Sequence, residues 1–119
     1  QWGTTYFSDQ QAGWLVSRAR SQARELMLNA GLEVKQNFLS LREANKRIDV
    51  ARQNVAHARE AYEAALAQYR EQVGTNFDVL DASSNLLSAE VALTAARGDY
   101  LTALSRLYRA MGEFHPELL

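Results

Sequence analysis

The chain has no cysteine among its 119 residues, a single proline, Pro116, and only six glycines. Without cysteine, a disulfide framework, a zinc knuckle and thiol chemistry are all excluded. The lack of cysteine also fits a protein outside the cytoplasm, although it does not prove one. Because so little proline and glycine interrupts the chain, long regular helices are expected.

Charge of one sign is not in excess either, since thirteen basic residues against fourteen acidic ones leave a net charge of -1. A general phosphate-binding surface needs a basic excess, so no nucleic-acid partner is expected. No run of about 18 apolar residues occurs, so no helix of this chain is expected to cross a bilayer. No basic-then-apolar leader follows Gln1, so no signal peptide is visible.

Residue sets that carry chemistry are missing as well. There is no Ser/His/Asp or Cys/His set, no glycine-rich phosphate loop and no pair of histidines at zinc-ligand spacing. His57 and His115 lie far apart in sequence, and His57 is interpreted as part of a solvated helix face. We therefore expect a protein that is not an enzyme and that binds no metal and no cofactor.

From about residue 8 to residue 72 the chain is free of proline and rich in Ala, Arg, Glu, Gln and Leu, which favour helix. Ser8 or Asp9 is suited to cap the start of this helix. A helix of about 65 residues is near 97 Å long at 1.5 Å per residue. Such a helix needs a partner along its length.

Apolar residues of this segment repeat every seven positions. Large side chains form one column and mostly alanine forms the other: Val34, Leu41, Ile48, Val55, Tyr62 and Tyr69 in the first, and Asn37, Ala44, Ala51, Ala58 and Ala65 in the second. This heptad pattern is typical of a coiled coil, and its strict period predicts left-handed supercoiling. The alanine column predicts a closely approaching neighbour.

The pattern breaks at Val73, Gly74, Thr75 and Asn76. Gly74 is expected to take the positive φ of a tight turn over residues 73–75. Thr75 followed by Asp78 has the spacing of a capping box, with Asp in place of the usual Glu. The second helix is expected over residues 76–111, with Gly112 as its C-cap. The predicted fold is all-α, a long antiparallel coiled-coil helical hairpin.

The second helix also repeats every seven residues, and it carries a further apolar stripe. Its columns are Val79, Leu86, Leu93, Tyr100 and Leu107, and Ala82, Ala89, Ala96, Ala103 and Ala110; the stripe is Leu80, Leu87, Val91, Leu101, Leu104 and Tyr108. Two stripes predict more than one helical neighbour, supplied by a missing half or by other subunits. A self-contained antiparallel dimer forming a four-helix bundle is an open alternative.

The two helices are unequal, so part of the first has no counterpart in the second. At about 1.5 Å per residue the second helix spans about 54 Å and leaves over 40 Å of the first unpaired. The unpaired part carries Trp14, Leu15, Leu26, Met27 and Leu28, which are expected to bury against something outside this chain.

The stretch from Tyr69 to Ala82 resembles the outer-membrane efflux family of TolC-like trimeric channel-tunnels. These proteins carry a motif of the form Y-x-x-G-x-x-x-x-x-D-V-L-D-A at a hairpin tip, and the matching residues are Tyr69, Asp78, Val79, Leu80, Asp81 and Ala82. The flanking alanine columns and the terminal Ala-Met-Gly112 follow the family pattern too, so that the resemblance covers about residues 15–112. One departure is Gln72, which stands where the family commonly has glycine.

The resemblance implies a place in a larger assembly. Family members are about four times this length and contain two such halves, so the hairpin is expected to be part of an α-barrel in a homotrimer. Residues 1–7 are expected to be the end of a barrel strand or a disordered terminus, residues 8–112 a periplasmic helical hairpin, and residues 113–119 a C-terminal tail. The implied location is the outer membrane of a Gram-negative bacterium.

The resemblance also assigns roles at the tip. Asp78, Asp81 and Tyr69 are candidates for the periplasmic entrance gate. Helix capping is an equal alternative for Asp78, and core packing is the more common role of an aromatic residue in the column of Tyr69. Val73, Gly74, Thr75 and Asn76 are the candidate contact for a periplasmic adaptor protein. The implied function is a passive export duct of a tripartite efflux or type I secretion system, driven by an inner-membrane pump. The alternative is a structural, adaptor-type coiled-coil hairpin.

Overall fold

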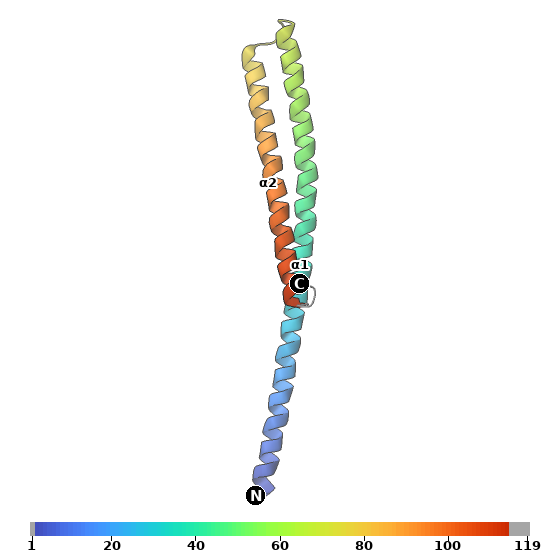
Figure 1. Ribbon diagram of the computed structural model, residues 1–119, viewed down its shortest axis with the longest axis vertical. Helices are drawn as coiled ribbons and strands as arrows, with labels where there is room; N and C mark the ends of the chain where they lie inside the picture. The colour runs from blue at the N-terminus through green and yellow to red at the C-terminus, as the bar shows by residue number, and fades with distance from the viewer. Residues whose placement is uncertain (1, 115–119) are drawn as a thin grey trace.

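The protein forms an extended hairpin of two antiparallel helices (Figure 1). The computed structural model describes residues 2–114, in which α1 spans Trp2–Arg70 and α2 spans Asn76–Phe114. Its principal extents are 105 × 23 × 14 Å. The described residues contain no strand, so the predicted all-α hairpin is confirmed.

The helix boundaries differ from the predicted ones at both outer ends. Residues 2–7 continue α1, so the expectation of a strand end or a disordered terminus there is wrong for these residues. At the other end α2 runs past Gly112, which is helical and buried and not a C-cap. Phe114 explains the extension, because its ring carbon lies 3.8 Å from the position that a Cβ on Gly31 would take. Of the expected tail, 113–114 are helical and 115–119 lie outside the described residues.

The heptad columns predicted from the sequence form the seam between α1 and α2. Every residue of the four columns is buried or half-buried, except Tyr69 next to the turn. The centre of the seam is a cluster of Ile48, Ala51 and Ala96, against which Leu93 and Tyr100 pack. Large side chains of one helix therefore lie against alanines of the other, which lets the two backbones approach closely.

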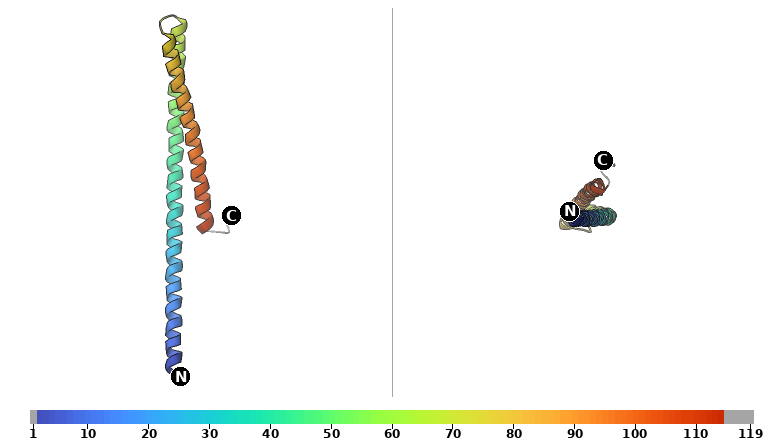
Figure 2. Two further views of the ribbon diagram at one scale, coloured as in Figure 1. Left: turned by 90° about the vertical axis from the view of Figure 1, so that its left-hand side faces the viewer. Right: turned by 90° about the horizontal axis from the view of Figure 1, so that it is seen from below.

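The two helices wrap around one another, as the seven-residue period predicts. Near the turn α2 lies to the left of α1 in Figure 1, and at its far end it lies in front of α1, as the left panel of Figure 2 shows. This sense of rotation is left-handed, in agreement with a repeat slightly shorter than two turns of an ideal helix.

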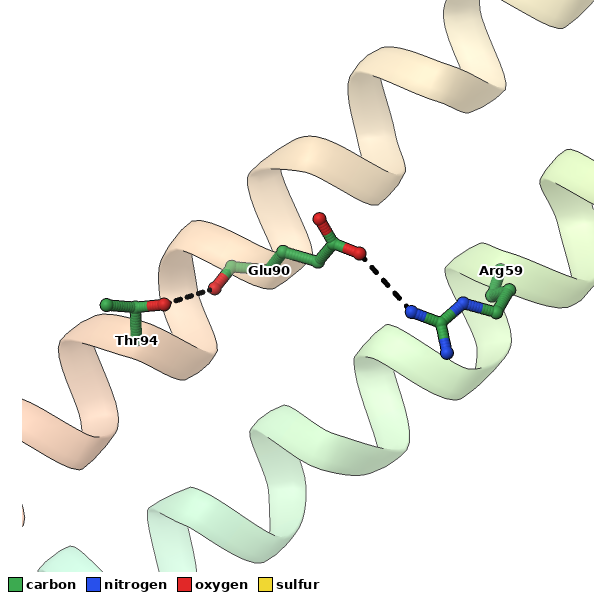
Figure 3. A network of polar contacts seen from close by, with 3 residues as sticks. All are labelled: Arg59, Glu90 and Thr94. Atoms are coloured by element: carbon green, nitrogen blue, oxygen red, sulfur yellow. Dashed lines mark hydrogen bonds and ion pairs between the residues drawn. The ribbon is translucent and has the colours of Figure 1, made fainter.

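An ion pair joins the two helices along the edge of the seam (Figure 3). Arg59 Nη2 donates to Glu90 Oε1 at 3.3 Å, and both side chains are about half exposed. An exposed pair of this kind is worth about 0–1 kcal/mol, so its main effect is on register. Thr94 Oγ1 donates to the Glu90 carbonyl at 3.1 Å and is thereby satisfied within its own helix.

The further apolar stripe of α2 and the unpaired part of α1 are both on the surface. Leu80, Leu87, Val91, Leu101 and Tyr108 are 56–62% exposed, and only Leu104 of the predicted stripe is half-buried. In α1, residues 2–29 extend beyond the end of α2, and we call them the overhang. Trp14, Leu15, Leu26, Met27 and Leu28 on the overhang are 58–70% exposed.

Candidate functional site: the hairpin tip

The reversal at the tip begins with a hydrogen-bonded end of α1. The Val73 N–H donates to the Gln68 carbonyl at 2.9 Å, and the Gln72 N–H donates to the Tyr69 carbonyl at 3.0 Å. These two bonds form a Schellman motif, in which the residue after the cap takes a left-handed conformation. That residue is Gln72, with φ of 64°. The helix therefore ends at Arg70 and not at residue 72.

The expected role of Gly74 is corrected by this geometry. Gly74 does not have positive φ; among the described residues Gln72 alone does. Gly74 is instead needed for close approach, because a Cβ there would lie 3.0 Å from the Gln68 Cβ and 3.4 Å from the Tyr69 nitrogen. Its own N–H donates to the Gln68 carbonyl at 3.0 Å, so the loop folds tightly back on the last turn of α1.

The start of α2 is the capping box that the sequence predicts. The Thr75 N–H donates to Asp78 Oδ2 at 3.1 Å, and the Asp78 N–H donates to Thr75 Oγ1 at 3.1 Å. Hydrogen bonds from Thr75 to the ionised carboxylate hold the pKa of Asp78 below its ordinary value. Asp78 thus caps the helix and adds a negative charge at the positive end of the helix dipole.

Asp81 lies three residues after Asp78, on the same face of α2. It is exposed and makes no hydrogen bond or ion pair within residues 2–114. Tyr69, the third gate candidate, has a side chain that is 47% exposed in the last turns of α1. The tip therefore has one carboxylate held in a cap and a second one free to meet ions in solution.

The apex presents an apolar surface that the sequence analysis did not single out. Val73 is 75% exposed and Phe77 is 74% exposed, so both side chains project into solvent beside the exposed Thr75 and Asn76. Phe77 was missing from the predicted tip contacts. Its position three residues before Leu80 is the signal that identifies it, because it extends the exposed stripe of α2 to the apex.

Residues 2–114 contain no group of three or more acidic or histidine side chains placed to hold a metal ion. His57 is exposed on α1. Neither of the described helices is long and apolar enough to cross a bilayer. The ionisable groups at the tip, Tyr69, Asp78 and Asp81, all lie on the surface.

An exposed tip, a narrow seam and exposed apolar surfaces define an extended coiled-coil hairpin. The chain belongs to the outer membrane efflux protein family, whose sequence pattern it matches over residues 1–113. This is a family of transport channels in the outer membrane of Gram-negative bacteria and not a family of enzymes. No curated protein and no solved structure matches the chain.

Proposed function

We propose that this hairpin is part of the wall of a trimeric outer-membrane export duct in a tripartite efflux or type I secretion system. In this proposal the hairpin lies in the periplasm, its tip forms the entrance, and the apex around Val73 and Gly74 docks a periplasmic adaptor protein. An inner-membrane pump supplies the energy. The family match favours this duct over an adaptor-type hairpin.

The position of the exposed apolar residues on α2 carries the proposal. Together with four small residues between them, they form a second heptad seam whose members lie alternately three and four residues apart. We call it the outer seam: Phe77, Leu80, Ser84, Leu87, Val91, Thr94, Gly98, Leu101, Ser105 and Tyr108. All ten residues are exposed. Successive residues of a heptad helix are rotated by about 103°, so the centre of the outer seam is about 150° from that of the buried seam.

Two seams about 150° apart place the neighbours of α2 on nearly opposite sides. Helices arranged in this way form a single curved layer, whereas a compact bundle brings the two neighbours of a helix closer together. A curved layer that closes on itself is a tube with a water-filled interior. The exposed apolar residues of the overhang fit the same wall, because they need neighbours beyond the end of α2.

Near the tip, acidic side chains lie on one face of this layer. Asp78 and Asp81 lie on one face, together with Ser88, which is seven residues after Asp81. Ser83 and the Arg59–Glu90 ion pair lie on the other. The proposed gate requires the Asp81 face to line the interior, where three copies of the hairpin bring six carboxylates around the entrance.

Two matched serines test this arrangement in the complete channel that contains this segment. Ser88→Cys and Ser83→Cys are both exposed substitutions on α2, and the chain has no cysteine of its own. We expect a bulky charged thiol reagent to reduce single-channel conductance in a planar bilayer for Ser88→Cys and to leave that of Ser83→Cys unchanged.

The other outcomes separate the gate from the duct. Reduced conductance for Ser83→Cys alone shows that the opposite face lines the interior, and it contradicts the gate assignment while keeping the duct. No effect on either variant, with labelling confirmed by mass spectrometry, contradicts the duct.

A further inference from the structure

The outer seam of α2 has two unlike columns. One column is large except at Thr94, namely Leu80, Leu87, Thr94, Leu101 and Tyr108, and the other is small at three of its five positions, namely Phe77, Ser84, Val91, Gly98 and Ser105. The buried seam has the same character, with large side chains against alanine. The outer seam is therefore suited to a closely approaching helix, and no described residue covers it.

Gly98 and Thr94 are adapted to such a neighbour. A Cβ on Gly98 would meet nothing within 4 Å, so nothing within the hairpin requires glycine there, although glycine weakens a helix. Thr94 donates its hydroxyl to the Glu90 carbonyl, which leaves no unsatisfied donor on its side chain. It can therefore enter an apolar seam without a polar partner.

We propose that the outer seam pairs with the outer seam of a second copy of this chain, with the two α2 helices antiparallel. In antiparallel coiled coils each core layer joins one residue of the first column to one of the second. One register gives five kinds of layer, each present twice because of the two-fold axis. Three join a large residue to a small one: Leu80 with Ser105, Ser84 with Leu101 and Leu87 with Gly98. The other two join Val91 with Thr94 and the aromatic rings of Phe77 and Tyr108.

Charged residues along the edge of the outer seam agree with this register. In the hairpin, the ion pair joins Arg59 and Glu90, which directly follow the core residues Ala58 and Ala89. The equivalent positions of the proposed pair are Asp81, which follows Leu80, and Arg109, which follows Tyr108. Asp81 of each copy then faces Arg109 of the other, on both sides of the two-fold axis.

A parallel arrangement lacks this complementarity. It would place Asp81 against Asp81 and Leu87 against Leu87, while Gly98 would face Gly98 and leave a gap. The antiparallel pair is isologous, with the same surface used by both copies. It makes a single layer of four helices in which the two overhangs point to opposite ends.

This pairing does not rest on the proposed function. The proposed duct requires that another helix of the assembly cover the outer seam, whereas the pairing concerns the 119-residue chain alone. The two proposals are tested on different proteins, so the failure of one leaves the other in place.

Cysteine pairing tests the register directly. Ser84→Cys and Leu101→Cys are prepared separately, mixed under reducing conditions and then oxidised. We expect the mixed disulfide to predominate, because residues 84 and 101 share a layer only in the antiparallel pair. Asn85→Cys, one residue outside the seam, is the control and is expected to form no disulfide with Leu101→Cys. The proposal is overturned if disulfides form mainly between two copies of Ser84→Cys or between two copies of Leu101→Cys.

A second experiment uses Gly98, and its readout is the dimer dissociation constant from sedimentation equilibrium. Gly98→Leu strengthens the helix but fills the space for Leu87 of the second copy, so the dimer is expected to weaken at least about tenfold. Gly13→Leu, at an equally open glycine on the overhang, is expected to leave the dimer intact. Circular dichroism verifies that both variants stay helical. A monomeric or trimeric wild-type chain, or a Gly98→Leu dimer as tight as wild type, overturns the proposal.

Discussion

At the apex of the hairpin, Gln72 and Gly74 each meet one of two requirements that a single glycine often meets alone, namely positive φ and space for close packing. Gln72 takes the left-handed conformation, and Gly74 allows the loop to lie against the last turn of α1. The family motif has glycine at the position of Gln72, which is the position where the structure requires positive φ. The reversal is therefore not displaced by the substitution; a residue with a Cβ simply adopts a costly conformation there.

Gln72→Gly is expected to stabilise the hairpin. Removing the Cβ relieves the left-handed strain, which is worth about 1 kcal/mol. Thermal unfolding at a fixed protein concentration measures the effect, and Gln72→Ala is the control because alanine keeps the Cβ. A Gln72→Gly variant no more stable than Gln72→Ala would contradict this account of the turn.

Gly74→Ala is expected to have the opposite effect. The added Cβ would lie 3.0 Å from the Gln68 Cβ, which belongs to a rigid part of α1, so the loop must shift. Such overpacking costs about 1–3 kcal/mol. The same unfolding measurement applies, with Gly13→Ala as the control because nothing lies within 4 Å of a Cβ at that position.

The cap made by Asp78 is expected to depend on pH. The pKa of Asp78 is lowered in the folded chain, so the folded state favours the ionised carboxylate. The stabilisation is then fully present above the ordinary value of 3.8 and is lost as the pH falls through the lowered pKa. The difference in melting temperature between wild type and Asp78→Asn should shrink on acidification below about 3.8. A difference that stays constant down to pH 2 would show that the charge is irrelevant to the cap, and Asp81→Asn serves as the control outside the cap.

At the scale of the helices, alternation of large and small side chains decides how α1 and α2 meet. Large side chains of one helix lie against alanines of the other, and the resulting close contact stabilises a two-helix layer that has no broad core. Tyr69 marks where this packing ends, since it continues the column but is half exposed beside the turn.

Ala96→Leu is expected to destabilise the hairpin by about 1–3 kcal/mol, because the seam has no room for a larger side chain. Ala96 is 7% exposed and lies in the central cluster with Ile48 and Ala51. Ala64→Leu, at an exposed alanine of α1, is the matched control and should change the melting temperature little. Equal effects of the two substitutions would mean that the alanine column does not set the distance between the helices.

For the molecule as a whole, most of the large apolar side chains lie outside the seam. The outer seam and the overhang leave them on the surface, so the fold is complete as a hairpin but not as an assembly. This property connects the family membership with the proposed wall of a duct, because a wall helix needs a neighbour on each side. It also explains why a second copy is able to occupy the outer seam of the chain alone.

Asp78→Ala combined with Asp81→Ala in the complete channel is expected to raise conductance and weaken block by multivalent cations at the entrance. In the proposed trimer, six converging carboxylates bind such cations more strongly than scattered ones, since charges held close share a counterion. Single-channel recording in a planar bilayer measures both quantities. Asp99→Ala, on the same face of α2 but far from the tip, is the control. If Asp78 and Asp81 act only as helix-capping charges, the double variant lowers stability and leaves selectivity and block unchanged.

The sequence by itself determined the two helices, their seam, the capping box and the existence of a second apolar face. These features depend on seven-residue spacing and on contacts within a few residues, both of which can be read along the chain. The family resemblance is confirmed for the same reason, since the tip motif and the alanine columns are local patterns. The gate roles of Asp78, Asp81 and Tyr69 and the adaptor contact at residues 73–76 remain predictions, because they depend on other chains.

The tertiary structure alone decided where the helices end and which residue makes the turn. Glycine at position 112 suggested a C-cap, but packing of Phe114 near Gly31 carries α2 two residues further. Gly74 suggested positive φ, but the hydrogen bonds to the Gln68 carbonyl place the left-handed residue at Gln72. At Gly112 a contact between α2 and α1 outweighs the preference of a single residue, because it joins parts of the chain whose distance in space no local pattern encodes. At the turn, the hydrogen bonds that end α1 outweigh the preference of glycine for positive φ.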